Sequence, residues 1–116
     1  MRLALILSVG LAIHPAAAQV PPDRYECDFV RIGVRETLHL GFVYDRARER
    51  ALMIGNNGTS DVLATQGSSV ISFLELLGSG AVQTTTIDPQ GNAIHSRHTF
   101  NREFMPSQWV GTCTRS

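Results

Sequence analysis

Two cysteines, Cys27 and Cys113, constrain the fold of this chain most, because they enclose most of its length. Two cysteines allow only one intramolecular pairing, and neither lies in a Cys-x-x-Cys redox motif. We therefore predict a disulfide between them, with two buried free thiols or an intermolecular bridge as the alternatives. In the chain-entropy model, a bridge across so long a loop stabilises the fold by about 4–5 kcal/mol.

The N-terminal segment has the three-part pattern of an export signal. A positive charge at Arg2 precedes the apolar run Leu3–Ile13, Pro15 interrupts it, and Ala16–Ala18 supply small residues. The run is too short for a membrane span, which needs roughly 20 apolar residues, and no later run is long enough. We predict cleavage after Ala18, a single domain over residues 19–116 without a membrane span, and a periplasmic or secreted location, where disulfides form.

The charge balance argues against nucleic-acid binding. The sequence holds 10 basic and 10 acidic residues, and every basic residue is an arginine. A chain this close to neutral has no excess of basic surface with which to bind phosphates. Its glycines, serines and threonines, with few helix-favouring runs, favour β structure.

Short segments with strand-like patterns recur along the mature chain. Turn signals such as Asn56-Asn57-Gly58 and Asp88-Pro89-Gln90-Gly91 separate them at intervals of about 8–12 residues. Segment 69–77 also fits a short helical stripe, but its β-branched start and flanking glycines favour a strand. The predicted strands are Tyr25–Ile32, Thr37–Tyr44, Ala51–Ile54, Asp61–Thr65, Ser69–Leu77, Ala81–Ile87, Ala93–Phe100 and Gln108–Thr112. They predict an all-β fold: a small antiparallel barrel or sandwich of about eight short strands, closed by one disulfide.

Aromatic residues on these strands are the expected core. We assign Tyr25, Phe29, Phe42 and Trp109 to it, because large aromatic side chains are mostly buried. Pro106, just before the last predicted strand, marks an edge or an irregular stretch, since proline has no N–H to donate.

The segment His95-Ser96-Arg97-His98 is the most site-like cluster and a candidate ligand or partner surface. Side chains alternate between the two faces of a strand, so His95 and His98 cannot chelate one ion without a bulge. Zinc needs three or four converging ligands, and only His39 on another strand could add one. No metal site is predicted. We expect Ile94, Ser96, His98 and Phe100 on the inner face, and His95, Arg97 and Thr99 on the outer face.

No catalytic residue and no cofactor are predicted. Ser96 lacks the Gly-x-Ser-x-Gly elbow of a nucleophilic serine. Glu75 lies in an apolar run, but we expect its side chain to point outward. The basic segment Arg46–Arg50 is expected to be a solvated turn.

Four motifs span most of the mature chain: the early Cys27, the strand Thr84–Asp88, the turn at Gly91 followed by His95–His98, and the ending Pro106–Cys113. In these motifs the chain resembles the small uncharacterised periplasmic proteins of alphaproteobacteria. The resemblance implies a periplasmic location and carries no activity.

A second resemblance rests on Ser79-Gly80-Ala81. This tripeptide is similar to the start of the inhibitory loop of the periplasmic C-type lysozyme inhibitors, which are small β-barrels with a disulfide between distant parts of the chain. In that family a basic or aromatic residue follows the Ser-Gly element, whereas Val82 stands in that place here. The resemblance implies inhibition through the turn Gly78–Gln83.

Taken together, the sequence predicts an exported small β-domain that binds a partner, such as another periplasmic protein, without chemistry of its own. The first alternative is a lysozyme-type inhibitor that uses the turn Gly78–Gln83. The second is a small hydrolase or metal-binding protein that uses His95 and His98. The candidate surface residues are His95, Arg97, His98, Ser79 and Gly80.

Overall fold

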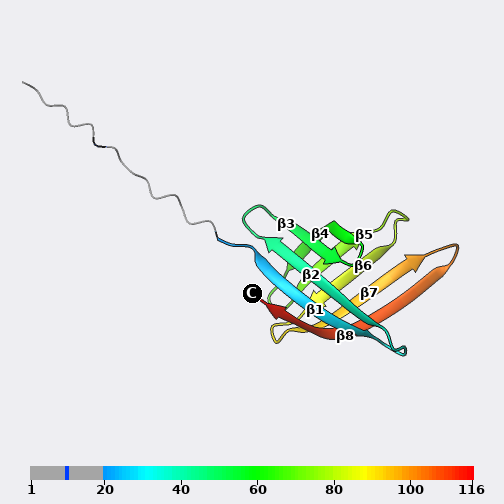
Figure 1. The fold of residues 1–116 in the computed structure, drawn as a ribbon. Helices are drawn as coiled ribbons and strands as arrows, with labels where there is room; N and C mark the ends of the chain where they lie inside the picture. Colours follow the sequence, from blue (N-terminus) through cyan, green and yellow to red (C-terminus); the bar gives the residue numbers. More distant parts are fainter. Residues whose placement is uncertain (1–9, 11–19) are drawn as a thin grey trace, which may run out of the picture.

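A computed structural model describes residue 10 and residues 20–116 of the chain. The predicted signal peptide, residues 1–18, lies outside the described residues except for Gly10. The strands are β1 (Asp23–Arg31), β2 (Thr37–Asp45), β3 (Arg50–Gly55), β4 (Gly58–Gln66), β5 (Ile71–Leu76), β6 (Val82–Ile87), β7 (Asn92–Phe100) and β8 (Phe104–Arg115). They pair antiparallel in chain order and β8 returns to β1, which closes a barrel (Figure 1). The all-β prediction is confirmed, with a barrel rather than a sandwich.

The disulfide lies across the seam that closes the barrel. Cys27 of β1 stands directly opposite Cys113 of β8 in the antiparallel register, and the two form the predicted bridge. The strands approach closely here, because a Cβ atom added to Gly111 would lie 1.8 Å from the carbonyl oxygen of Asp28. Glycine is therefore required at this position for β8 to pair with β1.

Aromatic side chains fill the centre of the barrel. Phe29, Phe42 and Phe73 are each 1% exposed, and the rings of Phe42 and Phe73 stack with their centroids 4.4 Å apart. Tyr25 and Trp109 are also buried, so the predicted aromatic core is confirmed. Burying each such side chain stabilises the fold by about 1.5–3 kcal/mol.

The ambiguous segment 69–77 forms β5. Its buried residues, Ile71 and Phe73, alternate with the less buried Ser72 and Leu74, which is the pattern of a strand with one face inward. The strand prediction is confirmed. The helical spacing of apolar residues in this segment comes from a strand with apolar residues on both faces, Ile71 and Phe73 on the inner face and Leu74 and Leu76 on the outer face.

The hairpin of β7 and β8 extends beyond its neighbours (Figure 1). Pairing of β8 with β1 ends near Ile32, whose N–H donates to the Gln108 carbonyl oxygen at 2.9 Å. Pro106 lies two residues before Gln108, so its backbone points to the same side, where β1 no longer provides a partner. Proline has no N–H group, so no unpaired donor is exposed at this edge. The edge prediction for Pro106 is confirmed, although β8 begins earlier than predicted.

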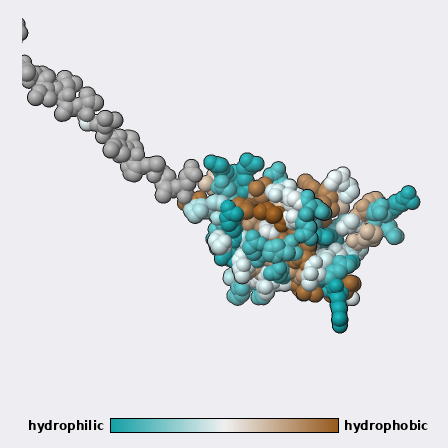
Figure 2. All heavy atoms as spheres, in the orientation of Figure 1, coloured by the Kyte–Doolittle hydropathy of each residue, from teal (hydrophilic) through white to brown (hydrophobic). Residues whose placement is uncertain are grey.

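Hydrophobic side chains also lie on the outer face of the barrel. Val30, Ile94 and Val110 occupy one row across β1, β8 and β7, and each is about half exposed. On the face drawn in Figure 2, hydrophobic residues emerge in separate groups between hydrophilic ones. None of the described residues belongs to a helix long and apolar enough to cross a membrane.

The antiparallel order gives the barrel two different ends. Loops 32–36, 56–57, 77–81 and 101–103 lie at one end, which we call the open end. Loops 46–49, 67–70 and 88–91 lie at the other, together with the start of β1 and the end of β8. We call this the clamped end, because Asp23 bonds to both Arg46 and Arg115 there.

Candidate functional site

The open end contains a cavity of about 440 Å³ with two unlike walls. Strands four apart in an eight-stranded barrel face each other, so β2 and β3 lie opposite β6 and β7. The wall on β2 and β3 is apolar and consists of Leu38, Leu40 and Met53. The wall on β5, β6 and β7 is polar and consists of Glu75, Gln83 and Arg97.

The polar wall is one row of hydrogen-bonded side chains. The register places Gln83 of β6 between Glu75 of β5 and Arg97 of β7. Its amide donates to the Glu75 carboxylate, and its carbonyl oxygen accepts from Arg97 Nε at 3.1 Å. Gln83 therefore holds an acid and a base in fixed positions on either side of it.

His95 lies one row deeper and is 0% exposed. Arg97 Nε donates to His95 Nε2 at 3.1 Å, so the ring proton is assigned to Nδ1, which donates to Thr85 Oγ1 at 2.7 Å. Burial, together with the nearby charge of Arg97, lowers the pKa of His95 to about 4. This histidine is neutral at physiological pH and serves to support Arg97.

Arg97 is fixed from a second side by Trp109. The Arg97 guanidinium carbon lies 5.5 Å from the centroid of the Trp109 ring, and the indole N–H donates to Ser107 Oγ at 3.2 Å. A guanidinium over an indole face is held by a cation–π attraction. Burial lowers the pKa of Arg97 below its ordinary value, but arginine remains charged at neutral pH.

The loop after β5, Gly78–Ala81, forms part of the rim of the open end. Leu77 N–H donates to the Ala81 carbonyl oxygen at 2.8 Å, and Gly80 N–H donates to the Leu77 carbonyl oxygen at 2.9 Å. Gly80 has φ of 90°, which a residue with a side chain rarely adopts. Ser79 is exposed, and its Oγ accepts from the Ala81 N–H at 3.3 Å. The loop is thus a preformed turn that presents Ser79 to solvent.

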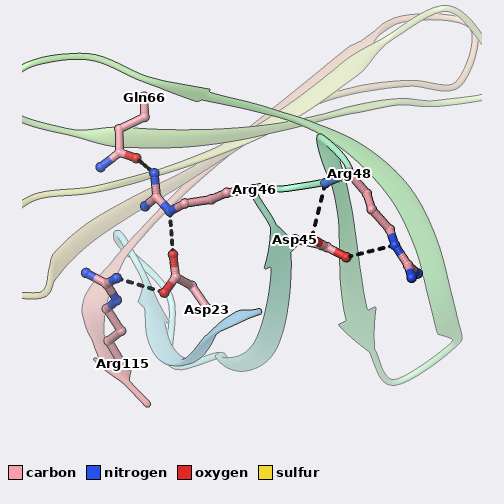
Figure 3. A network of polar contacts seen from close by, with 6 residues as sticks. All are labelled: Asp23, Asp45, Arg46, Arg48, Gln66 and Arg115. Carbon is pink, nitrogen blue, oxygen red and sulfur yellow. Dashed lines mark hydrogen bonds and ion pairs between the residues drawn. The ribbon is translucent and has the colours of Figure 1, made fainter. Parts of the chain in front are cut away.

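Asp23 is the centre of the clamped end (Figure 3). Its carboxylate accepts from Arg46 Nε and from Arg115 Nη2, both at 2.7 Å, and Arg46 also donates to Gln66. Burial alone would raise the pKa of Asp23, but the hydrogen bonds and charges of Arg115 and Arg46 outweigh it and lower the pKa. The network links the start of β1, the end of β8, the end of β4 and the loop after β2.

The clamped end has a cavity of about 420 Å³ of its own, between loops 67–70 and 88–91. Its charged lining residues, Asp88 and Arg115, already have partners. Asp88 Oδ1 accepts from the N–H groups of Gln90 and Asn92 at 2.9 and 2.8 Å, and Arg115 is bonded to Asp23. The cavity at the open end, where Glu75 and Arg97 face an apolar wall, is therefore the better candidate site.

The predicted surface cluster does not come together as one surface. His95 is fully buried and Arg97 points into the barrel, whereas His98 lies on the exposed outer side. The predicted faces of β7 are therefore wrong: His95 and Arg97 are inside, and Ile94 and Phe100 are outside. Ser79 and Gly80 lie together on the rim loop, as exposed residues.

The error on β7 has a physical reason. The prediction assumed that the apolar Ile94 and Phe100 would mark the inner face. In the structure Ile94 lies in the outer row with Val30 and Val110. Phe100 lies near the tip of the β7–β8 hairpin, where the centroids of its ring and the Phe104 ring are 5.3 Å apart. The interior at this level is polar, because Gln83 and Thr85 provide partners for Arg97 and His95.

One further expectation needs correction. Glu75 was expected to point outward, but it shares the polar wall of the open end with Gln83. A signal for this lay in strand spacing: Glu75 is two residues from the buried Phe73, a position that puts it on the inner face. Loop 46–49 is an exposed turn, as expected, and Arg46 in addition pairs with Asp23.

His39 does not join His95. It lies on the outer face of β2, where its ring nitrogens contact Glu26 at 2.7 Å and Asp28 at 2.8 Å. Hydrogen bonds to Asp28 and Glu26 raise its pKa above 6.5. Within residues 20–116, no group of three or more His, Cys, Asp or Glu side chains is placed to hold a metal ion.

Comparison with known proteins adds no relative: no family model, no curated protein and no solved structure matches the chain.

Proposed function

We propose that this chain is an exported, non-catalytic binding protein of the periplasm that recognises another protein with the open end of its barrel. The observation that carries the proposal is the hydrogen-bonded, exposed turn at Ser79 and Gly80 beside a concave mouth lined by Arg97 and Glu75. A preformed loop loses little conformational entropy on binding, and a mouth beside it can receive a partner side chain.

The location rests on two supports. The segment Arg2–Ala18 has the pattern of an export signal. A disulfide between Cys27 and Cys113 is compatible with an oxidising compartment. Export is tested by expressing the full chain in a bacterium and measuring the mass of the periplasmic product, which should begin at Gln19.

A second candidate function is inhibition of a lysozyme-type enzyme by the turn Gly78–Gln83. The observation that favours it is the position of this turn, at the rim and with Ser79 exposed. Val82 follows on β6, where the inhibitor family has a basic or aromatic residue. Arg97, which lines the mouth beside the turn, could supply the positive charge from another strand.

One experiment separates the two functions. The mature protein is immobilised and challenged with a C-type lysozyme and, separately, with a periplasmic extract. Ser79→Ala should weaken the binding of the partner, and Ser69→Ala, an exposed serine in a loop at the clamped end, is the matched control. Absence of lysozyme binding at micromolar concentration removes the inhibitor function, and equal effects of both variants on a captured protein remove the rim loop as the contact.

A further inference from the structure

The mouth of the open end is built to hold a molecule that is apolar on one side and charged on the other. Its volume of about 440 Å³ lies within the range of small-molecule sites. Leu38, Leu40 and Met53 form the apolar wall, opposite the row that contains Glu75 and Arg97. Such a division of one cavity favours an amphipathic ligand over a uniformly polar or uniformly apolar one.

The charges of the mouth define the ligand further. Of the described residues that line the cavity, only Glu75 and Arg97 are charged, so the site as a whole is close to neutral. A fatty acid would place its carboxylate near Glu75, and an amine would place its charge near Arg97. A ligand with both charges satisfies both residues, because opposite charges at close range attract more strongly in a partly buried site than in bulk water.

The donors and acceptors left over match such a ligand. Within the described part of the chain, the hydrogen bonds of the Arg97 side chain all use Nε, which leaves the two terminal amino groups of this cavity-lining residue without a hydrogen-bond partner. Glu75 uses Oε2 for Gln83, which leaves Oε1. A guanidinium end binds a carboxylate through two parallel hydrogen bonds, and a carboxylate oxygen binds an ammonium group.

The two charged residues also lie at a suitable separation. Both bond to the same Gln83 amide group, Arg97 to its oxygen and Glu75 to its nitrogen, so their polar ends lie near each other. An ammonium and a carboxylate on one carbon atom could reach both at once. From this geometry we infer that the mouth binds a free α-amino acid with an apolar side chain, its carboxylate on Arg97, its ammonium on Glu75 and its side chain against Leu40 and Met53.

The first test uses the unchanged mature protein and a series of ligands, so that folding of variants plays no part. Calorimetric titration compares leucine with N-acetylleucine, which lacks the ammonium charge, and with leucinamide, which lacks the carboxylate. Each analogue should bind at least about tenfold more weakly than leucine, because each loses a charged hydrogen bond. Failure of leucine to bind at millimolar concentration, or equal affinity for all three compounds, overturns the inference.

The second test asks whether Glu75 binds the ammonium group of leucine. Glu75→Gln keeps an oxygen that can accept from Gln83 but removes the charge. It should weaken leucine binding about tenfold and leave the affinity for N-acetylleucine unchanged. Arg50→Gln, in an exposed pair with Asp61 on the outside of the barrel, is the matched control and should change neither. Equal loss for both compounds would show that Glu75 does not contact the ammonium.

This inference concerns the same end of the barrel as the proposed function but does not depend on it. Ser79 does not line the cavity, so Ser79→Ala should leave leucine binding intact even where it weakens protein binding. Glu75 lines the mouth that both proposals use, so Glu75→Gln does not separate them. In the unchanged protein, leucine binding without capture of a protein would contradict the proposed function alone. Capture of a protein without leucine binding would contradict the amino-acid site alone.

Discussion

The two ends of the barrel use the same residue types for opposite purposes. At the clamped end, Asp23 joins Arg46 and Arg115 with its single carboxylate, so every charge in the cluster has a partner. At the open end, Gln83 stands between Glu75 and Arg97, so the acid and the base are held near each other without pairing directly. The difference is one amide, and it leaves charged groups available to a ligand.

The two clusters also differ in how their charged groups are stabilised. Direct pairing of Asp23 with two arginines offsets its desolvation and lowers its pKa. Arg97 is instead held by neutral groups, His95, Gln83 and the ring of Trp109, which fix its position. The charges of Glu75 and Glu36 also act on it, but within the described residues neither forms a direct ion pair with it. A site that holds a charged group in place without a direct ion pair is pre-organised for binding.

The largest expected effect on stability comes from the disulfide across the β1–β8 seam, beside the clamped end. Replacing both Cys27 and Cys113 with serine should lower the free energy of unfolding by about 4 kcal/mol, because the bridge closes a long loop. Urea unfolding monitored by Trp109 fluorescence measures the loss, and intact mass after alkylation, with and without reduction, verifies the bridge in the parent protein. A change below about 1 kcal/mol would show that the strand pairing alone secures the seam.

The next effect lies at the open end and depends on pH. His95 takes up a proton at pH 6.5 in the unfolded chain but only at about pH 4 in the barrel, so the unfolded state binds more protons between these values. The contribution of His95 to stability is therefore fully present above pH 6.5 and is lost as the pH falls to about 4. The loss should approach about 3 kcal/mol, at about 1.4 kcal/mol per pKa unit.

Variants assign this dependence to the buried ring. His95→Gln should flatten the decline between pH 6.5 and about 4, whereas His98→Gln, on the exposed side of the same strand, should retain it. His39 has a raised pKa and so acts in the opposite sense: its contribution is present at low pH and is lost as the pH rises through the folded value. If the free energy of unfolding of His95→Gln still fell by the full amount over this pH range, a group other than His95 would be the cause.

A smaller effect is expected from the clamp itself. Asp23→Asn should cost about 1 kcal/mol, because its two arginine partners are largely exposed and exposed ion pairs contribute little. Asp61→Asn, which loses only a 3.9 Å pair with Arg50, is the control and should be close to neutral. Thermal unfolding of both variants gives the comparison, and equal melting temperatures would mean that the clamp adds nothing to the barrel.

The smallest effect on stability belongs to the rim. Ser79→Ala should change the free energy of unfolding by less than about 0.5 kcal/mol, since the side chain is exposed and its one hydrogen bond, from Ala81 N–H, is long. Urea unfolding gives the value. A clearly larger loss would identify Ser79 as a structural residue, and any effect of this variant on binding would then need another explanation.

The strands were predictable from the sequence because turns and alternation are local signals. Asn56-Asn57-Gly58 and Asp88–Gly91 mark reversals in any context, and the position of Cys27 opposite Cys113 followed once the first and last strands were recognised. The open-end site was not predictable in the same way. Whether Arg97 faces inward depends on Gln83 and on Glu75 two strands away, and alternation alone does not identify which face of β7 is the interior.

The chain order of the barrel has a consequence for its folding. Every pair of neighbouring strands except β1 and β8 is also consecutive in sequence, so each strand can join the sheet as a simple hairpin. Only the β1–β8 seam requires distant segments to meet, and it therefore carries nearly all the entropic cost of long-range loop closure. An open, curled sheet with two free edges is the expected precursor, and the last step of folding is the meeting of those edges.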